Sequence, residues 1–135
     1  MMGRLDGKVA IVTGGNSGVG AVTAELFAKE GAKVVISARR LPQLEEVAEK
    51  IRANGGEVLA VPTDVSKVED VENLVNKTVE AYGKIDILVN NAGVLEEGLK
   101  PVDKFSDEDL EWVLGINTKG CLYCTRAVLR ELVKT

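Results

Sequence analysis

The feature that most constrains this chain is a glycine-rich segment between a short apolar run and a helical pattern. The run Val9–Val12 is β-branched, which is typical of a buried strand, and residues 21–28 have helical spacing. Between them, Thr13–Gly20 reads Thr-Gly-Gly-Asn-Ser-Gly-Val-Gly. Glycines let such a turn approach a phosphate, and the helix N-terminus that follows offers unpaired N–H groups. We therefore interpret the segment as a phosphate-binding turn rather than a plain structural turn, formed through Gly14, Gly18 and Gly20.

Composition and charge restrict the function further. The 135 residues fit one domain, and a hydrophobic content of 45% suffices for a packed core. The net charge of −4 argues against a nucleic-acid partner, which favours a basic face. Histidine is absent, which removes His-based acid–base chemistry and most zinc sites, so we expect no metal. No apolar run approaches the roughly 20 residues that span a bilayer and no signal peptide opens the chain, so we expect a cytoplasmic protein without membrane contact.

Strand and helix patterns alternate along the chain. After the first strand, further strands are expected at 33–37, 57–61 and 85–89. Alternation of this kind predicts βαβ units, an α/β fold with a doubly wound parallel sheet of strand order 3-2-1-4. The complete dinucleotide-binding fold has the order 3-2-1-4-5-6. We therefore expect residues 1–135 to be an incomplete nucleotide-binding domain, the first half of something longer.

Helix boundaries are marked by residues that favour helix N-termini. Pro42 suits the first turn of the helix after the second strand. Ser66 and Glu69 are spaced as a capping box for the next helix, and Ser106 is expected to cap a later one. These signals place the loops before each helix at the carboxyl ends of the strands.

Cys121 and Cys124 form a C-x-x-C pair, which is compatible with a redox pair or with half a metal site. They lie in an apolar helical stretch, and the chain has no second cysteine pair to complete a zinc site. We expect reduced thiols packed in the core.

Four motifs in this order resemble the short-chain dehydrogenase/reductase family: the glycine-rich segment, Asp64 after the third strand, Asn90-Asn91-Ala92-Gly93 after the fourth, and Asn117 in a helix. The overall look is nearest to 3-oxoacyl-carrier-protein reductases and to the sugar, alcohol and steroid dehydrogenases beside them, and the sequence does not choose among these. The resemblance implies a Rossmann-type fold, a nicotinamide dinucleotide cofactor, and a small carbonyl or alcohol substrate in the complete enzyme.

The resemblance also implies roles for single residues. Asp64 would accept a hydrogen bond from the adenine amino group and Val65 would pack on the ring, while Asn117 would hold a catalytic water through its carbonyl. Each of these polar residues also has a plain structural alternative, as a turn residue or a helix interruption. The remaining cofactor contacts implied are Gly14, Asn16, Ser17, Gly18, Val19 and Gly20 at the phosphates and adenosine ribose, and Asn90, Asn91, Ala92 and Gly93 at the ribose and between neighbouring strands.

The end of the second strand predicts the form of the cofactor. Enzymes that prefer NAD usually carry an acidic residue there to bind the ribose 2′-hydroxyl. This chain has Ala38 followed by Arg39 and Arg40, and a guanidinium pairs well with a 2′-phosphate. We therefore expect NADP(H) to be preferred over NAD(H), with Arg39 as the main contact. The alternative is a solvated basic pair before Pro42.

One family feature is missing from these residues. The family uses a serine and a Tyr-x-x-x-Lys pair for proton transfer, whereas Asp86 lies four residues after Tyr82 and Ala127 four residues after Tyr123. Both tyrosines are interpreted as packing residues. We therefore expect the cofactor-binding half of an oxidoreductase, inactive by itself; the alternatives are a catalytically inactive nucleotide-binding or assembly module and a thiol-redox protein.

A homo-oligomer is also expected. The strand at 85–89 has one charge and no proline to block edge pairing, and the helical residues around Trp112 and Leu122–Leu132 are apolar. The resemblance implies that family members dimerise through the last of these helices.

Overall fold

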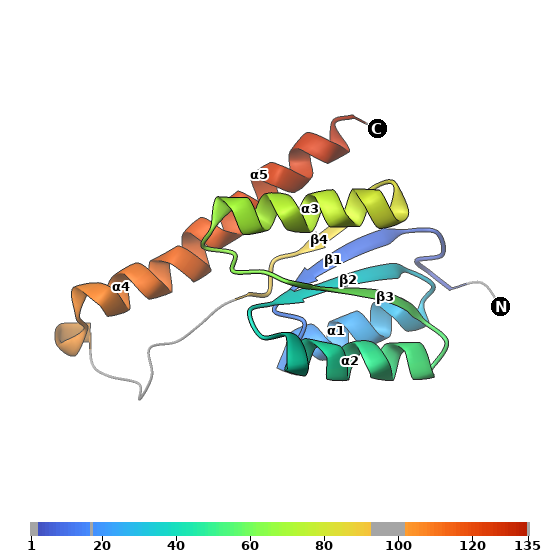
Figure 1. Ribbon diagram of the computed structural model, residues 1–135, viewed down its shortest axis with the longest axis horizontal. Helices are drawn as coiled ribbons and strands as arrows, with labels where there is room; N and C mark the ends of the chain where they lie inside the picture. The colour runs from blue at the N-terminus through green and yellow to red at the C-terminus, as the bar shows by residue number, and fades with distance from the viewer. Residues whose placement is uncertain (1–2, 17, 93–101, 135) are drawn as a thin grey trace.

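The computed structural model describes residues 3–16, 18–92 and 102–134 of the chain (Figure 1). Strands and helices alternate from the N-terminus, as the sequence patterns predict. The elements are β1 (Val9–Thr13), α1 (Gly18–Lys29), β2 (Lys33–Ala38), α2 (Leu41–Ala53), β3 (Glu57–Pro62), α3 (Val68–Tyr82), β4 (Ile87–Val89), a 3₁₀ turn (Val102–Lys104), α4 (Asp107–Leu114), a π-helical segment (Gly115–Gly120) and α5 (Cys121–Leu132).

The four strands form one parallel sheet in the order β3-β2-β1-β4, which confirms the predicted fold class and strand order. Helices α1 and α2 cover one face of this sheet, and α3 and α5 cover the other (Figure 1). Because successive strands are added on one side of β1 and then on the other, the winding direction changes between β1 and β4. In open α/β sheets, ligands bind at this change, outside the carboxyl ends of the strands.

The core consists of two layers, one on each face of the sheet. Strand β1 contributes to both, because its alternating residues point to opposite faces. Val12 packs with the α1 and α2 side, and Ile11 packs with the α3 and α5 side. All residues of β1 are buried, as are the four central residues of β2. Burial on both faces explains why these strands are continuous apolar runs rather than alternating ones.

Two local predictions need correction. Strand β4 begins at Ile87 rather than at residue 85. The Asp86 amide donates to the Val9 carbonyl (2.8 Å), but the Val9 amide donates to the Asp86 carboxylate (2.9 Å) instead of to a backbone carbonyl of β4. The capping box expected at Ser66 is wrong. The residue before α3 is Lys67, which makes no side-chain cap, and the Ser66 hydroxyl donates to the Asp64 carboxylate instead.

The cap expected at Ser106 is confirmed. Its side chain accepts a hydrogen bond from the Asp109 amide (3.0 Å), and the Asp109 carboxylate accepts one from the Ser106 amide (3.0 Å). From Asp107 to Leu132 the backbone stays helical through the π-helical segment, so α4 and α5 form one continuous rod (Figure 1).

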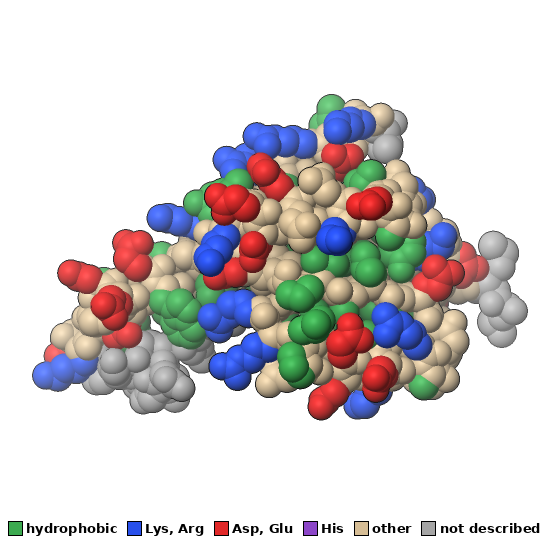
Figure 2. Space-filling view, in the orientation of Figure 1, with side chains coloured by type: hydrophobic (Ala, Val, Ile, Leu, Met, Phe, Trp, Pro, Cys, Tyr) green, Lys and Arg blue, Asp and Glu red, His purple; other side chains and the backbone are tan. Residues whose placement is uncertain are grey.

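On the face drawn in Figure 2, acidic and basic side chains are interspersed over α2, α3 and α5, and no extended area of one sign stands out. Among the described residues, no helix combines the length and the apolar character needed to cross a membrane.

Candidate functional site

A cleft of about 320 Å³ lies at the carboxyl ends of β1, β2 and β3, beside the change in winding direction. Its lining residues come from the turn after β1, the end of β2, the loops after β2 and β3, the segment after β4, the start of α2 and the π-helical segment. Seven of the residues expected to bind the cofactor line it: Gly14, Asn16, Ala38, Arg39, Asp64, Val65 and Ala92. The other lining residues are Ser37, Arg40, Gln43, Thr63 and Ile116. Of these, only Arg40 was considered in the sequence analysis, beside Arg39.

The turn after β1 needs glycine at defined points. Gly14 and Gly18 have positive φ angles of 68° and 56°, a region that favours glycine. A Cβ on Gly14 would lie 3.1 Å from the Ala92 backbone, and one on Gly20 would overlap the Gly14 carbonyl oxygen. Gly20 thus lets α1 approach the turn, but neither Gly18, Val19 nor Gly20 lines the cleft. Val19 is 74% exposed, and the predicted Ser17 lies outside the described residues.

Thr13 joins the glycine turn to the end of β4. Its hydroxyl accepts hydrogen bonds from the amides of Asn91 and Ala92, both at 3.0 Å, and donates to the Val89 carbonyl (3.3 Å). The Asn91 side chain donates to the Gly14 carbonyl (3.2 Å). The expected tie between strand 4 and its neighbour is therefore present. Thr13 was missed as its centre, although a buried threonine at a strand end is a usable signal.

Asn90 bonds to α5 rather than to the glycine turn. Its side-chain amide donates to the Thr125 hydroxyl (3.0 Å), which in turn donates to the Cys121 carbonyl on α5 (2.8 Å). Asn90 is exposed and does not line the cleft, and Gly93 lies outside the described residues. Asn90 therefore fixes the end of β4 against α5.

The side chain and the amide of Asp64 make three of the hydrogen bonds that hold the loop after β3. Asp64 Oδ1 accepts from the Ser66 amide (3.0 Å) and hydroxyl (2.6 Å), and the Asp64 amide donates to Asp70 Oδ2 (2.8 Å). Val65 is buried against Ile116 and neighbouring apolar side chains. Asp64 is thus a turn residue and a cleft residue at once, so its two sequence interpretations are compatible.

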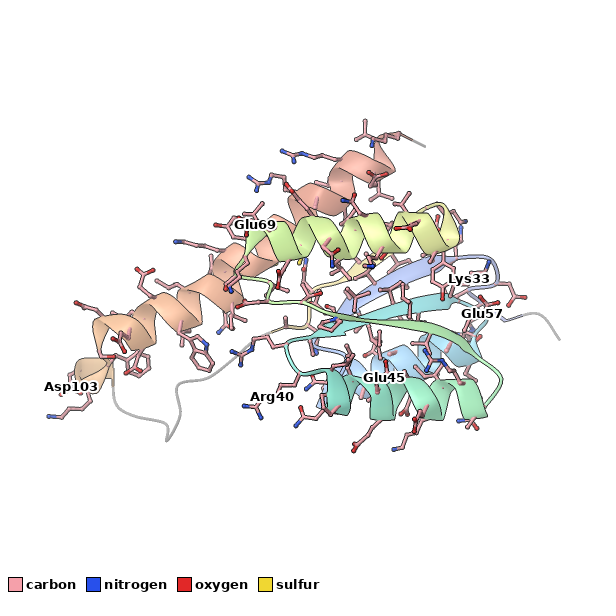
Figure 3. All side chains as sticks on the ribbon, viewed as in Figure 1. Lys33, Arg40, Glu45, Glu57, Glu69 and Asp103 are labelled. Atoms are coloured by element: carbon pink, nitrogen blue, oxygen red, sulfur yellow. The ribbon has the colours of Figure 1, made fainter. Side chains whose placement is uncertain are left out.

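The loop after β2 gives the cleft its basic edge. The Arg39 guanidinium lies over the Trp112 ring, with its carbon 5.6 Å from the ring centroid. Arg40 precedes α2 and points away from the sheet (Figure 3). On the opposite wall, the Asn16 amide donates to Gln43 Oε1 on α2 (3.0 Å).

Ser37 lines the cleft, but its hydroxyl does not open into it. The hydroxyl oxygen is buried and has no hydrogen-bond partner among the described residues. A buried hydroxyl without a partner is costly, so Ser37 lowers the stability of the cleft wall.

The π-helical segment brings the long rod against the loop after β3. Ile116 and Gly120 are its buried residues, and a Cβ on Gly120 would collide with the Val65 side chain. Such π-helical insertions are frequent at functional sites. Asn117 lies in this segment next to Ile116, but it is exposed and does not line the cleft.

Both tyrosines are partly buried against apolar clusters, as interpreted from the sequence. Tyr82 packs on the α3 and α5 side of the sheet, and Lys33 Nζ lies 5.6 Å from its ring centroid. Burial and, next, the nearby Glu57 carboxylate raise the pKa of Tyr82 above its usual value. Tyr82 also ends α3 at the amino edge of the sheet, away from the cleft, so it is not placed to donate a proton there.

Cys124 matches the packing interpretation, whereas Cys121 is only half-buried. Cys124 is 2% exposed within the cluster around Val65, and burial raises its pKa to about 11. At neutral pH the thiol is therefore protonated, whereas redox chemistry requires the thiolate.

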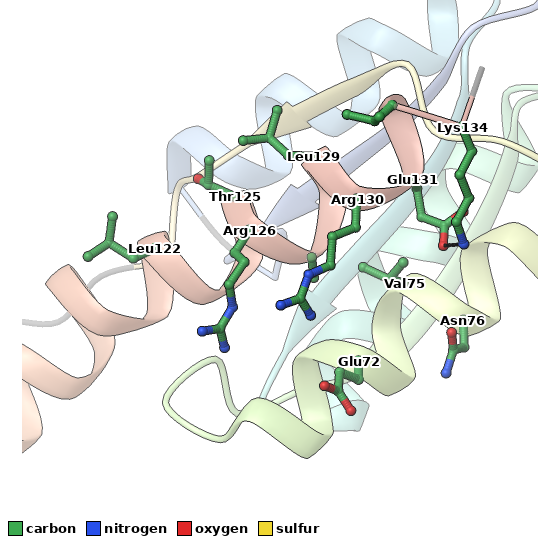
Figure 4. Close-up of a pocket in the computed structure, with 12 residues that line it drawn as sticks. Glu72, Val75, Asn76, Leu122, Thr125, Arg126, Leu129, Arg130, Glu131 and Lys134 are labelled. Atoms are coloured by element: carbon green, nitrogen blue, oxygen red, sulfur yellow. Dashed lines mark hydrogen bonds and ion pairs between the residues drawn. The ribbon is translucent and has the colours of Figure 1, made fainter.

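A larger groove of about 980 Å³ lies between α3 and α5 (Figure 4). Arg126 and Arg130 extend from α5 on the side where α3 presents Glu72 (Figure 4). Leu122, Leu129 and Val133 contribute exposed apolar surface. None of the predicted cofactor-binding residues that the structure describes lines this groove, so its size does not make it the nucleotide site.

Known proteins resemble this chain in sequence and in fold. Residues 8–135 match the family described as short chain dehydrogenase. An uncharacterised oxidoreductase of Listeria monocytogenes is 41% identical over 126 residues, which cover 93% of this chain and 50% of that protein. Tropinone reductase-like 1 of Erythroxylum coca is 44% identical over 133 residues, covering 97% and 48%. The chain spans about half the length of these curated relatives.

A solved structure agrees with these relatives. A metagenomic short-chain oxidoreductase in complex with NADP superposes with a TM-score of 0.90 at 32% identity, covering 96% of this chain and 58% of that one. The family match, the sequence identities and the strand order all agree, and the chain belongs to the short-chain dehydrogenase family.

Proposed function

We propose that this chain binds NADP(H) and forms the cofactor-binding half of an oxidoreductase that acts on a carbonyl or alcohol. The carrying observation is the cleft itself, which joins the glycine turn after β1 to Arg39 and Arg40 after β2. The NADP-bound relative of similar fold supports this proposal. When bound, the nicotinamide ring would supply or accept the hydride, and the protein would provide binding and orientation.

The phosphates would bind at the glycine turn. Gly14 has no side chain to fill the space beside Ala92, and the N-terminus of α1 follows at Gly18. Unpaired N–H groups and the helix dipole favour an anion at this position.

The adenine would bind beside the loop after β3. Val65 and Ile116 supply an apolar wall, and Asp64 Oδ1 is already occupied by Ser66. Asp64 Oδ2 would accept the hydrogen bond from the adenine amino group. The bonds from Ser66 and to Asp70 would keep this carboxylate oriented before the nucleotide arrives.

The 2′-phosphate would bind at the end of β2. Ala38 is neutral, so a phosphate placed there meets no carboxylate of this residue, and Arg39 offers a planar guanidinium. No carboxylate among the described residues forms a salt bridge with Arg39. The positive charge is therefore available for a phosphate.

Calorimetric titration of the chain with NADP⁺ and NAD⁺ tests the proposal. We expect tighter binding of NADP⁺, and we expect Arg39→Ala to weaken NADP⁺ binding about tenfold or more with little effect on NAD⁺, since charged hydrogen bonds contribute about 1.5–3 kcal/mol. Arg130→Ala, an exposed arginine on α5, is the matched control. Tighter binding of NAD⁺ would contradict the proposal.

The catalytic role of Asn117 stays a proposal based on its family position. These 135 residues contain no Tyr-x-x-x-Lys, so we expect no ketone-dependent NADPH oxidation by this chain alone. Steady turnover that disappears in Asn117→Ala would contradict this expectation. Nucleotide binding without turnover would leave the binding half of the proposal intact.

A further inference from the structure

Trp112 is the only tryptophan of the sequence, and it lies on a helix with no buried residue. Its side chain is 39% exposed, so it is not used as a core residue. Instead its ring lies under the Arg39 guanidinium, 5.6 Å from the ring centroid to the guanidinium carbon. This distance is within the range of a cation–π contact, about 6 Å. The contact joins α4 to the loop after β2.

The contact leaves the charge of Arg39 available. An aromatic face attracts the guanidinium without neutralising it, whereas a carboxylate would. A guanidinium that lies over a ring keeps N–H groups that can bind a phosphate, because the ring offers no carboxylate oxygen to accept them. Trp112 can therefore orient Arg39 without competing for its hydrogen bonds.

The position of Trp112 along the rod supports this role. Ile116 follows Trp112 by one helical turn and lines the cleft. Arg39 lines the cleft from the opposite loop. Trp112 thus lies beside the cleft, on the same helix as its Ile116 wall.

We propose that Trp112 is a positioning residue for cofactor specificity: it holds Arg39 at the edge of the cleft where the 2′-phosphate binds. The inference rests on the proposed NADP(H) function. A free arginine side chain carries about 2 kcal/mol of rotamer entropy, part of which is lost when it binds a phosphate. A side chain held over the Trp112 ring has lost part of that freedom already, so the preference for the 2′-phosphate depends on α4 as well as on β2.

Calorimetry on five variants, four single and one double, tests the inference. In Trp112→Leu we expect NADP⁺ binding to weaken about two- to fivefold, which corresponds to the 0.5–1 kcal/mol of an exposed cation–π contact, with NAD⁺ binding unchanged. Trp112→Phe, which keeps an aromatic face, should lose less. Leu114→Ala removes a 50% exposed side chain from the same helix and should change neither affinity. In Arg39→Ala, adding Trp112→Leu should have no further effect.

The single tryptophan provides a second readout that needs no mutation at position 112. We expect 2′,5′-ADP to change the fluorescence of Trp112 more than 5′-AMP does, and this difference to disappear in Arg39→Ala. An equal loss of NAD⁺ and NADP⁺ affinity in Trp112→Leu, no loss, or tighter NADP⁺ binding would overturn the inference.

The two proposals fail in different ways. If Arg39→Ala keeps the preference for NADP⁺, the proposed 2′-phosphate contact is wrong and the role of Trp112 falls with it. If Arg39→Ala loses the preference while Trp112→Leu and Trp112→Phe keep it, only the role of Trp112 is overturned.

Discussion

Strands β1 and β4 are neighbours in one parallel sheet, yet every residue of β1 is buried and every residue of β4 is half-buried. The difference continues into the helices. Four residues of α2 are buried, whereas α4 has none and α5 carries the exposed Leu122 and Leu129. Strand β4 and helix α4 therefore bury less of their side chains than β1, β2 and α2 do. The cleft joins the two regions, because Ala92 after β4 and Ile116 line it together with the loops after β1, β2 and β3.

Truncating a side chain in β1 and one in β4 should show the largest difference in the loss of stability. Ile11→Ala in β1 removes a side chain with 0% exposure, so we expect a loss of about 2–5 kcal/mol in the free energy of unfolding. Ile87→Ala in half-buried β4 should cost about 1 kcal/mol, because less apolar area is lost. Urea unfolding of both variants measures the difference. Equal losses would mean that β4 is as well covered in solution as β1.

Thr13 links the end of β1 to the end of β4, and removal of its hydroxyl should give the next largest loss of stability. Thr13→Val keeps the shape but leaves the amides of Asn91 and Ala92 without their acceptor, which should cost about 1–3 kcal/mol. Nucleotide affinity should also fall, because Ala92 lines the cleft. Thr13→Ser retains the oxygen and serves as the control. A Thr13→Val protein of unchanged stability would show that water replaces the hydroxyl.

The exposed surface of α5 should have a smaller, concentration-dependent effect. Leu122, Leu129 and Val133 are 62%, 52% and 83% exposed, and we expect self-association at micromolar concentration through this helix. Leu129→Ser should weaken the association about tenfold, since burying a leucine contributes about 1.5–3 kcal/mol. Leu110→Ser on α4 is the control. Sedimentation of the wild-type chain as a stable monomer would contradict this prediction.

The smallest effect is expected at Asp86, where the amino end of β4 meets β1. Burial raises the pKa of Asp86, but the Val9 amide, Lys84 and Lys8 outweigh it, so the pKa lies below its usual value. The ionised Asp86 carboxylate therefore stabilises the folded protein above the pKa that this group has in the unfolded chain. This stabilisation is lost as the pH falls through its pKa in the folded protein. Asp86→Asn should cost less than about 1 kcal/mol near neutral pH and nothing in acid. Unfolding midpoints of both proteins, measured from neutral pH into acid, test this prediction. A stability loss in Asp86→Asn that grows in acid would contradict it.

Local patterns were sufficient for the order of the elements and for most of the cleft. Each strand was visible as a short apolar run, and the loops after β1, β2 and β3 follow from their ends. Gly14, Arg39 and Asp64 could therefore be assigned to one edge of the sheet from the sequence alone, because parallel strands align their carboxyl ends. The capping box predicted at Ser66 was wrong because it depends on which partner the hydroxyl meets in three dimensions. Spacing alone could not show that the hydroxyl had a nearer acceptor in Asp64.

What the sequence by itself determined were features set by neighbours along the chain: strand runs, helix periodicity, the glycine turn and the Ser106 cap. Only the tertiary structure decided which distant side chains meet. The Thr13 hydroxyl reaches amides at positions 91 and 92, and Arg39 lies over Trp112. Such contacts depend on how helices and strands are packed in space, and their separation in sequence leaves no periodic signal from which to predict them.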